Sequence, residues 1–228
     1  MIPFFYDPSI LLLIPALILA GYAQWKVRSA YARFSKVPSR GGRSGAEIAR
    51  AILGGNGLGD VSVRETPGEL SDHYDPRSRS VSLSAGNYRS HSIAAVGIAA
   101  HEVGHALQHG SGYGPLAFRH AVFPVANLGS TLAFPLFFIG FLMSYRPLID
   151  LGILLFAGAV LFSLVTLPVE FNASRRAVAE LERGGFLAPD ELPAAREVLR
   201  AAALTYVAAA TMAILQLLRL LILRGRKG

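Results

Sequence analysis

Four long apolar runs limit what this chain of 228 residues can fold into more than any other feature. They cover about residues 9–25, 121–145, 151–169 and 201–223. A helix of about 20 apolar residues is long enough to cross the hydrocarbon core of a bilayer. Charged residues make up only 16% of the chain, whereas an average soluble domain carries about 25%. We therefore predict a mainly α, multi-pass membrane protein.

The charges around the first run indicate its direction. Asp7 precedes the run and no Lys or Arg does, whereas a secretory signal peptide has its positive charge before the apolar core. The basic residues follow it: Lys26, Arg28, Arg33, Lys36, Arg40 and Arg43. We interpret the run as an uncleaved anchor with its N-terminus outside and its basic segment in the cytoplasm. The alternative is a cleaved signal that ends near Ala20.

The second and third runs are separated by a short turn and predict a transmembrane hairpin. The fourth run differs because it carries Gln216 and Arg219, so it can either span the membrane or pack along the other helices at the interface. The terminal segment RGRKG favours the cytoplasm, which conflicts with a fourth straight span. Both arrangements stay open on the sequence alone.

A more polar stretch between the first two runs predicts a small α+β region. Ser44 can cap a helix, and two segments, one from Val61 and one over residues 79–84, alternate apolar and polar side chains. We predict that these two segments form a β-hairpin across the turn-rich residues between them. A helix rich in small residues follows from about Asn87 and contains the sequence HEVGH.

HEVGH places two histidines, His101 and His105, four residues apart. On a helix such residues share a face, so their imidazoles can bind one Zn²⁺ ion. The glutamate between them, Glu102, lies close to the open position of such an ion. It can act as the general base that takes a proton from a zinc-activated water. Because the chain has no Cys, every zinc ligand must be His, Asp or Glu.

A catalytic zinc site usually has three protein ligands, so one more is needed. His109 lies about 12 Å from His101 along a helix and cannot reach the same ion. A later ligand must return to the same face of the membrane, and an even number of spans must precede it. Glu170, directly after the predicted hairpin, meets this condition, whereas Asp150 does not. Glu180 and Glu182 lie further along and are typical solvated surface charges, although Glu170 could also be a plain interfacial charge.

The segment VEFNASRRA, which contains Glu170, resembles the E-F-x-A-D element of the HtpX and CAAX-prenyl endopeptidase group of membrane gluzincins. That resemblance implies that His101, His105 and Glu170 bind zinc and that Glu102 is the general base. Ser174 stands where the group has an aspartate that orients a zinc-binding histidine. The resemblance therefore leaves Ser174 as a weaker candidate for that role.

Over nearly its full length the chain is similar to the YugP-like family of bacterial membrane zinc metallopeptidases. Four segments carry this resemblance together with the N-terminal anchor: GELSDHYDPR, IAAHEVGHALQH, TLPVEFNASRRA and AALTYVAAA. The resemblance implies a zincin-like catalytic domain in a protein of the bacterial inner membrane. We expect its partners to be the bilayer and a peptide or membrane-protein substrate, and the net charge of +7 to meet anionic lipid headgroups rather than nucleic acid.

Two further groups are candidates for contact with a substrate. In zincins a strand before the active-site helix commonly pairs with an extended peptide, which makes Val81, Ser82 and Leu83 candidates for such a strand. Ordinary pairing within a sheet is an equal alternative. His73 and Tyr74 precede this strand and could stabilise a transition state.

These observations divide the chain into five segments. They are an anchor with its basic segment (1–37), a cytoplasmic-face zincin-like region (38–115), a transmembrane hairpin (116–169), a cytoplasmic helix with the third ligand (170–200) and a C-terminal apolar helix (201–228). We expect a zinc-dependent endopeptidase with its active site at the cytoplasmic face. The alternatives are a site-2-type intramembrane metalloprotease and a non-catalytic membrane scaffold with a structural zinc.

Overall fold

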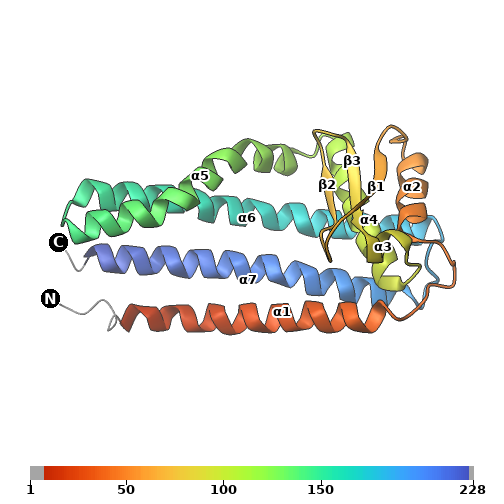
Figure 1. Ribbon diagram of the computed structural model, residues 1–228, viewed down its shortest axis with the longest axis horizontal. Helices are drawn as coiled ribbons and strands as arrows, with labels where there is room; N and C mark the ends of the chain where they lie inside the picture. The colour runs from red at the N-terminus through yellow and green to blue at the C-terminus, as the bar shows by residue number, and fades with distance from the viewer. Residues whose placement is uncertain (1–7, 226–228) are drawn as a thin grey trace. The chain divides into compact units, whose positions relative to one another are not determined.

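The computed structural model describes residues 8–225 (Figure 1). Asp7 and the last three residues of RGRKG, which enter the prediction of orientation, lie outside the described residues. The chain divides into two compact units. Unit 1 comprises Met1–Ala23, Phe118–Leu167 and Thr205–Gly228, and unit 2 comprises Gln24–Ala117 and Pro168–Leu204.

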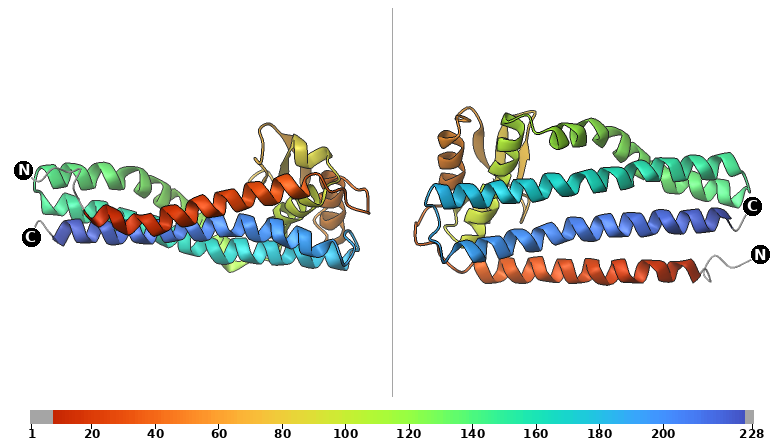
Figure 2. Two further views of the ribbon diagram at one scale, coloured as in Figure 1. Left: turned by 90° about the horizontal axis from the view of Figure 1, so that it is seen from below. Right: turned by 180° about the vertical axis from the view of Figure 1, so that it is seen from behind.

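Four long helices run through the chain. A 3₁₀ segment, η2 (Pro8–Leu13), leads into α1 (Ile14–Phe34), and the other three are α5 (Gly114–Leu142), α6 (Arg146–Arg183) and α7 (Leu192–Gly225). By length and composition each is apolar enough to cross a membrane, including α7, which contains the ambiguous fourth run. Within unit 1 their segments lie side by side in the order α5, α6, α7, α1 (Figures 1 and 2). The prediction of a mainly α membrane protein is confirmed.

Glycines bring α5 and α6 close together in unit 1. A Cβ atom on Gly129 or Gly152 would lie 2.9 or 2.7 Å from a backbone oxygen of the other helix, and one on Gly140 would lie 2.7 Å from a backbone nitrogen. Small residues at such positions allow helices to pack closely where no water drives their association. Phenylalanines fill the adjacent core, with Phe137 fully buried between α5 and α6.

The structure differs from the expected cytoplasmic helix over residues 170–200. Residues 170–183 are the last part of α6, which continues through Pro168, and α7 begins at Leu192. A proline removes one N–H group from a helix, and neighbouring groups can compensate for that loss in a membrane helix. The change from apolar to charged composition near Glu170 therefore does not end the helix.

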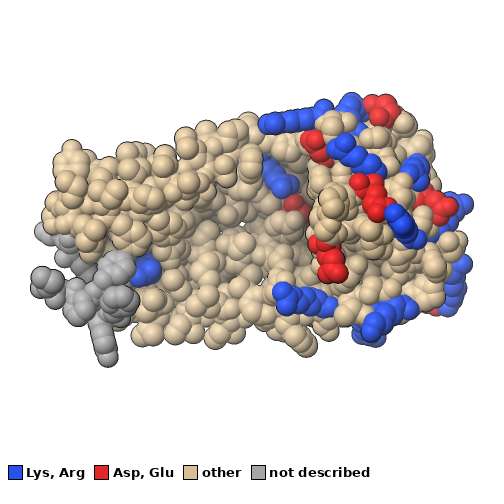
Figure 3. Space-filling view, viewed as in Figure 1, with Lys and Arg blue, Asp and Glu red and all other residues tan. Residues whose placement is uncertain are grey.

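Unit 2 contains a three-stranded sheet and three shorter helices. In chain order these are α2 (Gly45–Gly55), β1 (Ser62–Thr66), β2 (His73–Asp75), β3 (Ser80–Ser84), α3 (Ala85–Arg89) and α4 (Ile93–Gly110). Ser44 caps α2 as predicted, in a reciprocal pair of hydrogen bonds with Glu47. Charged side chains gather over unit 2, whereas unit 1 has almost none on the face seen in Figure 3.

The predicted hairpin between the segment from Val61 and residues 79–84 is wrong, because these strands, β1 and β3, run parallel. β3 pairs antiparallel with β2, which had been assigned to the connecting turn, and parallel with β1. The order of strands is β1-β3-β2. The alternation of side chains gives the two faces of a strand, but it does not say which neighbour the strand pairs with or in which direction.

The strand β3 separates a polar layer from an apolar one. Val81 and Leu83 are fully buried in a core that also contains side chains of α2, α4, α6 and α7. The serines of β3 are also buried, and the backbone N–H of Ser84 donates to the carboxylate of Asp72 at 2.8 Å. The sheet therefore supports α4, the helix that carries HEVGH.

Candidate metal centre

The helix α4 positions the two histidines of HEVGH. Ser92 caps its N-terminus, where the hydroxyl accepts a hydrogen bond from the N–H of Ala95 at 3.2 Å. One face of the helix lies in the core of unit 2. His101 and His105, one turn apart, have ring centroids 4.9 Å apart with the rings nearly perpendicular. The pair is therefore held on a helix whose start and buried face are both fixed.

A glycine inside the motif lets α6 approach this face. A Cβ atom on Gly104 would lie 2.5 Å from the carbonyl oxygen of Ala173 and 3.2 Å from its Cα. No side chain fits there without moving one helix. The close contact at Gly104 thus brings the segment of α6 around Glu170 against HEVGH.

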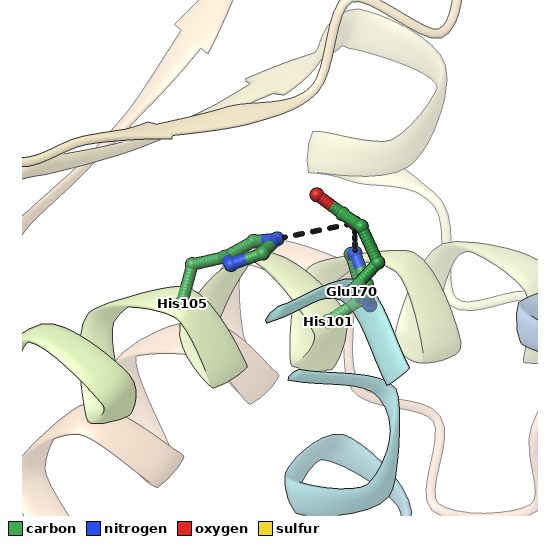
Figure 4. A group of neighbouring side chains, drawn as sticks. All are labelled: His101, His105 and Glu170. Carbon is green, nitrogen blue, oxygen red and sulfur yellow. Dashed lines mark hydrogen bonds and ion pairs between the residues drawn. The ribbon is translucent and has the colours of Figure 1, made fainter. Parts of the chain in front are cut away.

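Glu170 completes a group of three donors. Its Oε2 atom lies 3.3 Å from Nε2 of His101 and 3.5 Å from Nε2 of His105. In Figure 4 the two imidazoles of α4 and the carboxylate of α6 point toward one another. Glu170 is 2% exposed, so its carboxylate is almost completely removed from water. Within residues 8–225 this is the one group of three His, Asp or Glu donors close enough to share an ion.

The donor set fits a zinc ion. Tetrahedral zinc bonds to histidine nitrogen and carboxylate oxygen are about 2.1 Å long, which separates neighbouring donors by about 3.4 Å. The separations of 3.3 and 3.5 Å between Glu170 and the histidines match this value. Two imidazoles and one carboxylate, with Cys absent from the chain, form a donor set typical of a catalytic zinc.

The electrostatics of the group also call for a cation. Burial lowers the pKa of His105, but Glu170 and Glu102 outweigh burial and raise it. A buried carboxylate is costly unless a positive charge neutralises it. Either a protonated imidazole or a metal ion can supply that charge.

Glu102 lies next to this group without being one of its three donors. Burial raises the pKa of its carboxyl group, and the neighbouring His101 and His105 oppose that effect. The residue is 8% exposed. A buried carboxyl group with a raised pKa is typical of a residue that accepts a proton in catalysis.

Each histidine has a further polar contact through its other ring nitrogen. Ser174 Oγ lies 3.1 Å from Nδ1 of His101, the kind of contact that was predicted for Ser174 from the sequence. Gln108 Oε1 lies 3.0 Å from Nδ1 of His105. Gln108 is not among the residues predicted from the sequence, although its spacing of three residues from His105 on a helix places the two side chains on one face.

The other candidates from the sequence lie in different surroundings. His73 bonds through Nδ1 to the carbonyl oxygen of Ser71 at 2.8 Å, and the hydroxyl of Tyr74 lies 2.8 Å from Nδ1 of His109. Burial raises the pKa of Tyr74. His109 is outside the donor group, as predicted, and it occupies the last turn of α4. Neither His73 nor Tyr74 has a direct bond to the three donors among the interactions described.

The predicted substrate strand requires a correction. Val81 and Ser82 belong to β3, which has β1 on one side and β2 on the other, and Leu83 is paired with β1. All three residues are buried. An incoming peptide cannot pair with Val81 or Ser82, which have strands on both sides, so ordinary sheet pairing describes these two residues. For Leu83, which has β1 as its strand partner, contact with a substrate stays a prediction.

The acidic residues that the sequence did not favour as the third ligand form ion pairs away from the donor group. Glu180 pairs with Arg183 at 2.6 Å and Glu182 with Arg196 at 3.6 Å, both as partly exposed ion pairs. Asp150 pairs with Arg224 in unit 1 at 2.5 Å. Each has the ordinary role of a paired charge.

Two histidines and a glutamate that converge in this way form a group that could hold a metal ion, and they do so in a protein with four candidate membrane spans. The chain belongs to the family described as "Putative neutral zinc metallopeptidase", whose model matches residues 9–225. It is 51% identical over 219 residues to "Putative membrane protease YugP" of Bacillus subtilis (strain 168). The aligned residues make up 95% of this chain and 97% of that protein. No solved structure matches the chain. The resemblance to the YugP-like family is confirmed.

Proposed function

We propose that the protein is a membrane-bound zinc endopeptidase that hydrolyses peptide bonds at the cytoplasmic face of the bacterial inner membrane. One observation carries the proposal: His101, His105 and Glu170 converge from two helices, beside the buried carboxylate of Glu102. Membership of a zinc metallopeptidase family supports the same reading.

His101, His105 and Glu170 would hold the metal. When bound, zinc supplies Lewis acidity to a water molecule and to the scissile carbonyl group. Glu102 takes one proton from the attacking water and passes it to the nitrogen of the leaving amine. The new bond joins the water oxygen to the carbonyl carbon, and the bond between that carbon and nitrogen breaks. The raised pKa of Glu102 favours this shuttle, because a carboxyl group with a higher pKa accepts a proton more readily.

The location of the donor helix favours a site at the membrane surface over a site inside the bilayer. Among the described residues, the four candidate membrane spans contain α1, α5, α6 and α7. The helix α4, which carries HEVGH, is not one of these four. A site-2-type protease would carry HEVGH on a membrane-spanning helix. The basic residues that follow the first apolar run favour the cytoplasmic side for this surface.

The test is the variant Glu102→Gln, measured for both zinc content and cleavage of an unstructured peptide in detergent. We expect zinc to be retained and cleavage to fall by about 10²–10⁴-fold, the usual contribution of a general base. Cleavage at the wild-type rate would contradict the proposed role of Glu102. Wild-type protein that binds zinc but cleaves no peptide would favour the alternative of a non-catalytic scaffold.

A further inference from the structure

Gln108 is a fully buried amide one turn after His105 on α4. It has three hydrogen-bond partners. Its Oε1 atom lies 3.0 Å from Nδ1 of His105, and its Nε2 atom donates to the carbonyl oxygen of Val169 at 2.8 Å and to Oδ1 of Asn172 at 3.0 Å. One end of the amide therefore meets a candidate metal ligand, and the other meets the turn of α6 that carries Glu170.

The partners on α6 leave the amide only one orientation. The carbonyl oxygen of Val169 can only accept a hydrogen bond, so the amide atom facing it must be the NH₂ group. The guanidinium of Arg176 can only donate, and its Nε atom lies 2.9 Å from Oδ1 of Asn172. That contact identifies the oxygen of Asn172, which again requires the NH₂ group of Gln108 opposite it. Two independent partners thus direct Oε1 of Gln108 toward His105.

This orientation determines the tautomer of His105. An amide oxygen only accepts, so the ring nitrogen facing it, Nδ1, must carry the hydrogen. In a neutral imidazole the other nitrogen, Nε2, then has its lone pair free. Nε2 is the atom that lies 3.5 Å from Glu170. The equivalent contact of His101 with Ser174 is less restrictive, because a hydroxyl can either donate or accept.

We propose that Gln108 is a positioning residue that holds His105 in the tautomer required for metal binding and ties it to the Glu170 segment of α6. The inference rests on the proposed zinc site. One chain of hydrogen bonds runs from Arg176 through Asn172 and Gln108 to His105. This chain gives the polar residues of VEFNASRR and HALQ that it includes a common role, which is to hold His105. Contacts of this kind typically change metal affinity by about 10–100-fold when they are removed.

The experiment compares wild-type protein with Gln108→Met, which has a similar volume but no amide. The first readout is the ¹⁵N NMR spectrum of metal-free protein with ¹⁵N-labelled histidine and neutral imidazoles. We expect His105 to carry its hydrogen on Nδ1 in wild type and to show a mixture of tautomers in Gln108→Met. The second readout is zinc affinity by competition with a chelator, and we expect a loss of about 10–100-fold.

Leu107→Ala is the matched control, because Leu107 is buried in the core on the same turn and its side chain makes no hydrogen bond. It should lower thermal stability and leave zinc affinity and the tautomer unchanged. If the neutral His105 of wild type carries its hydrogen on Nε2, the inference is overturned. This result comes from wild-type protein alone and does not depend on whether a variant folds. An unchanged tautomer and zinc affinity in folded Gln108→Met would overturn it as well. Wild-type protein that binds no zinc would instead contradict the proposed function, and the NMR result would still report on Gln108.

Discussion

Ser174 Oγ lies 3.1 Å from Nδ1 of His101, one turn after Glu170 on α6. By the resemblance of VEFNASRRA to the gluzincin element, Ser174 stands where an aspartate is expected, and it contacts His101, the kind of residue that such an aspartate would orient. A hydroxyl is neutral and can rotate, so it supports the imidazole less strongly than a carboxylate does. Having serine instead of aspartate at position 174 should therefore change the affinity for zinc measurably.

We expect Ser174→Ala to weaken zinc binding by about tenfold, the lower end of the range for partners of ligating histidines. Ser174→Asp should bind zinc at least as tightly as wild type, because a carboxylate makes a stronger hydrogen bond to the ring N–H. Chelator competition on both purified variants measures this. Equal affinity of Ser174→Ala and wild type would show that the contact has no influence on the site.

A second prediction concerns the close approach of α4 and α6. Gly104→Ala would place a Cβ atom 2.5 Å from the carbonyl oxygen of Ala173, so one helix must move. Overpacking of this kind costs about 1–3 kcal/mol. We expect a thermal midpoint lower by several degrees and a loss of zinc, because the movement separates Glu170 from the histidines.

Gly97→Ala is the control for that experiment. The position lies on the same helix, and its added Cβ would make ordinary contact with Ala195 at 3.6 Å. Alanine favours a helix over glycine by up to about 1 kcal/mol, so this variant should be as stable as wild type or more stable. Similar losses in both variants would mean that the contact at Ala173 is not the cause.

The HEVGH donors and Glu170 could be predicted because each depends on a local pattern or on the order of segments. Two histidines four apart on a helix share a face whatever surrounds them. Glu170 was selected by counting membrane spans and by the VEFNASRRA resemblance, and neither requires knowledge of side-chain packing.

Gln108 and the strand pairing could not be predicted in the same way. The role of Gln108 depends on Val169 and Asn172, more than 60 residues away, and an amide near the end of an apolar helix looks like a surface residue. The parallel pairing of β1 with β3 depends on how the intervening chain crosses, which side-chain alternation does not encode. The short strand His73–Asp75 is followed directly by Pro76, a residue more typical of a turn.

The orientation in the membrane can be tested by cysteine labelling, because the chain has no native Cys. We expect Arg77→Cys and Arg175→Cys, both exposed positions of unit 2, to react with an impermeant reagent only from the cytoplasmic side. Met143→Cys, at an exposed position in the turn between α5 and α6, should react only from the opposite side. Labelling of Arg77→Cys and Arg175→Cys from different sides would contradict the proposed topology.

Zinc analysis of purified protein tests the central claim most directly. Wild type should contain about one zinc ion per chain, and Glu170→Ala should lose it, because two histidines alone leave the ion without its third protein ligand. Glu182→Ala, which removes an exposed carboxylate of the same helix, should retain the zinc of wild type. Glu170→Ala protein that is folded and still holds one zinc per chain would contradict the assignment of His101, His105 and Glu170 as the metal centre.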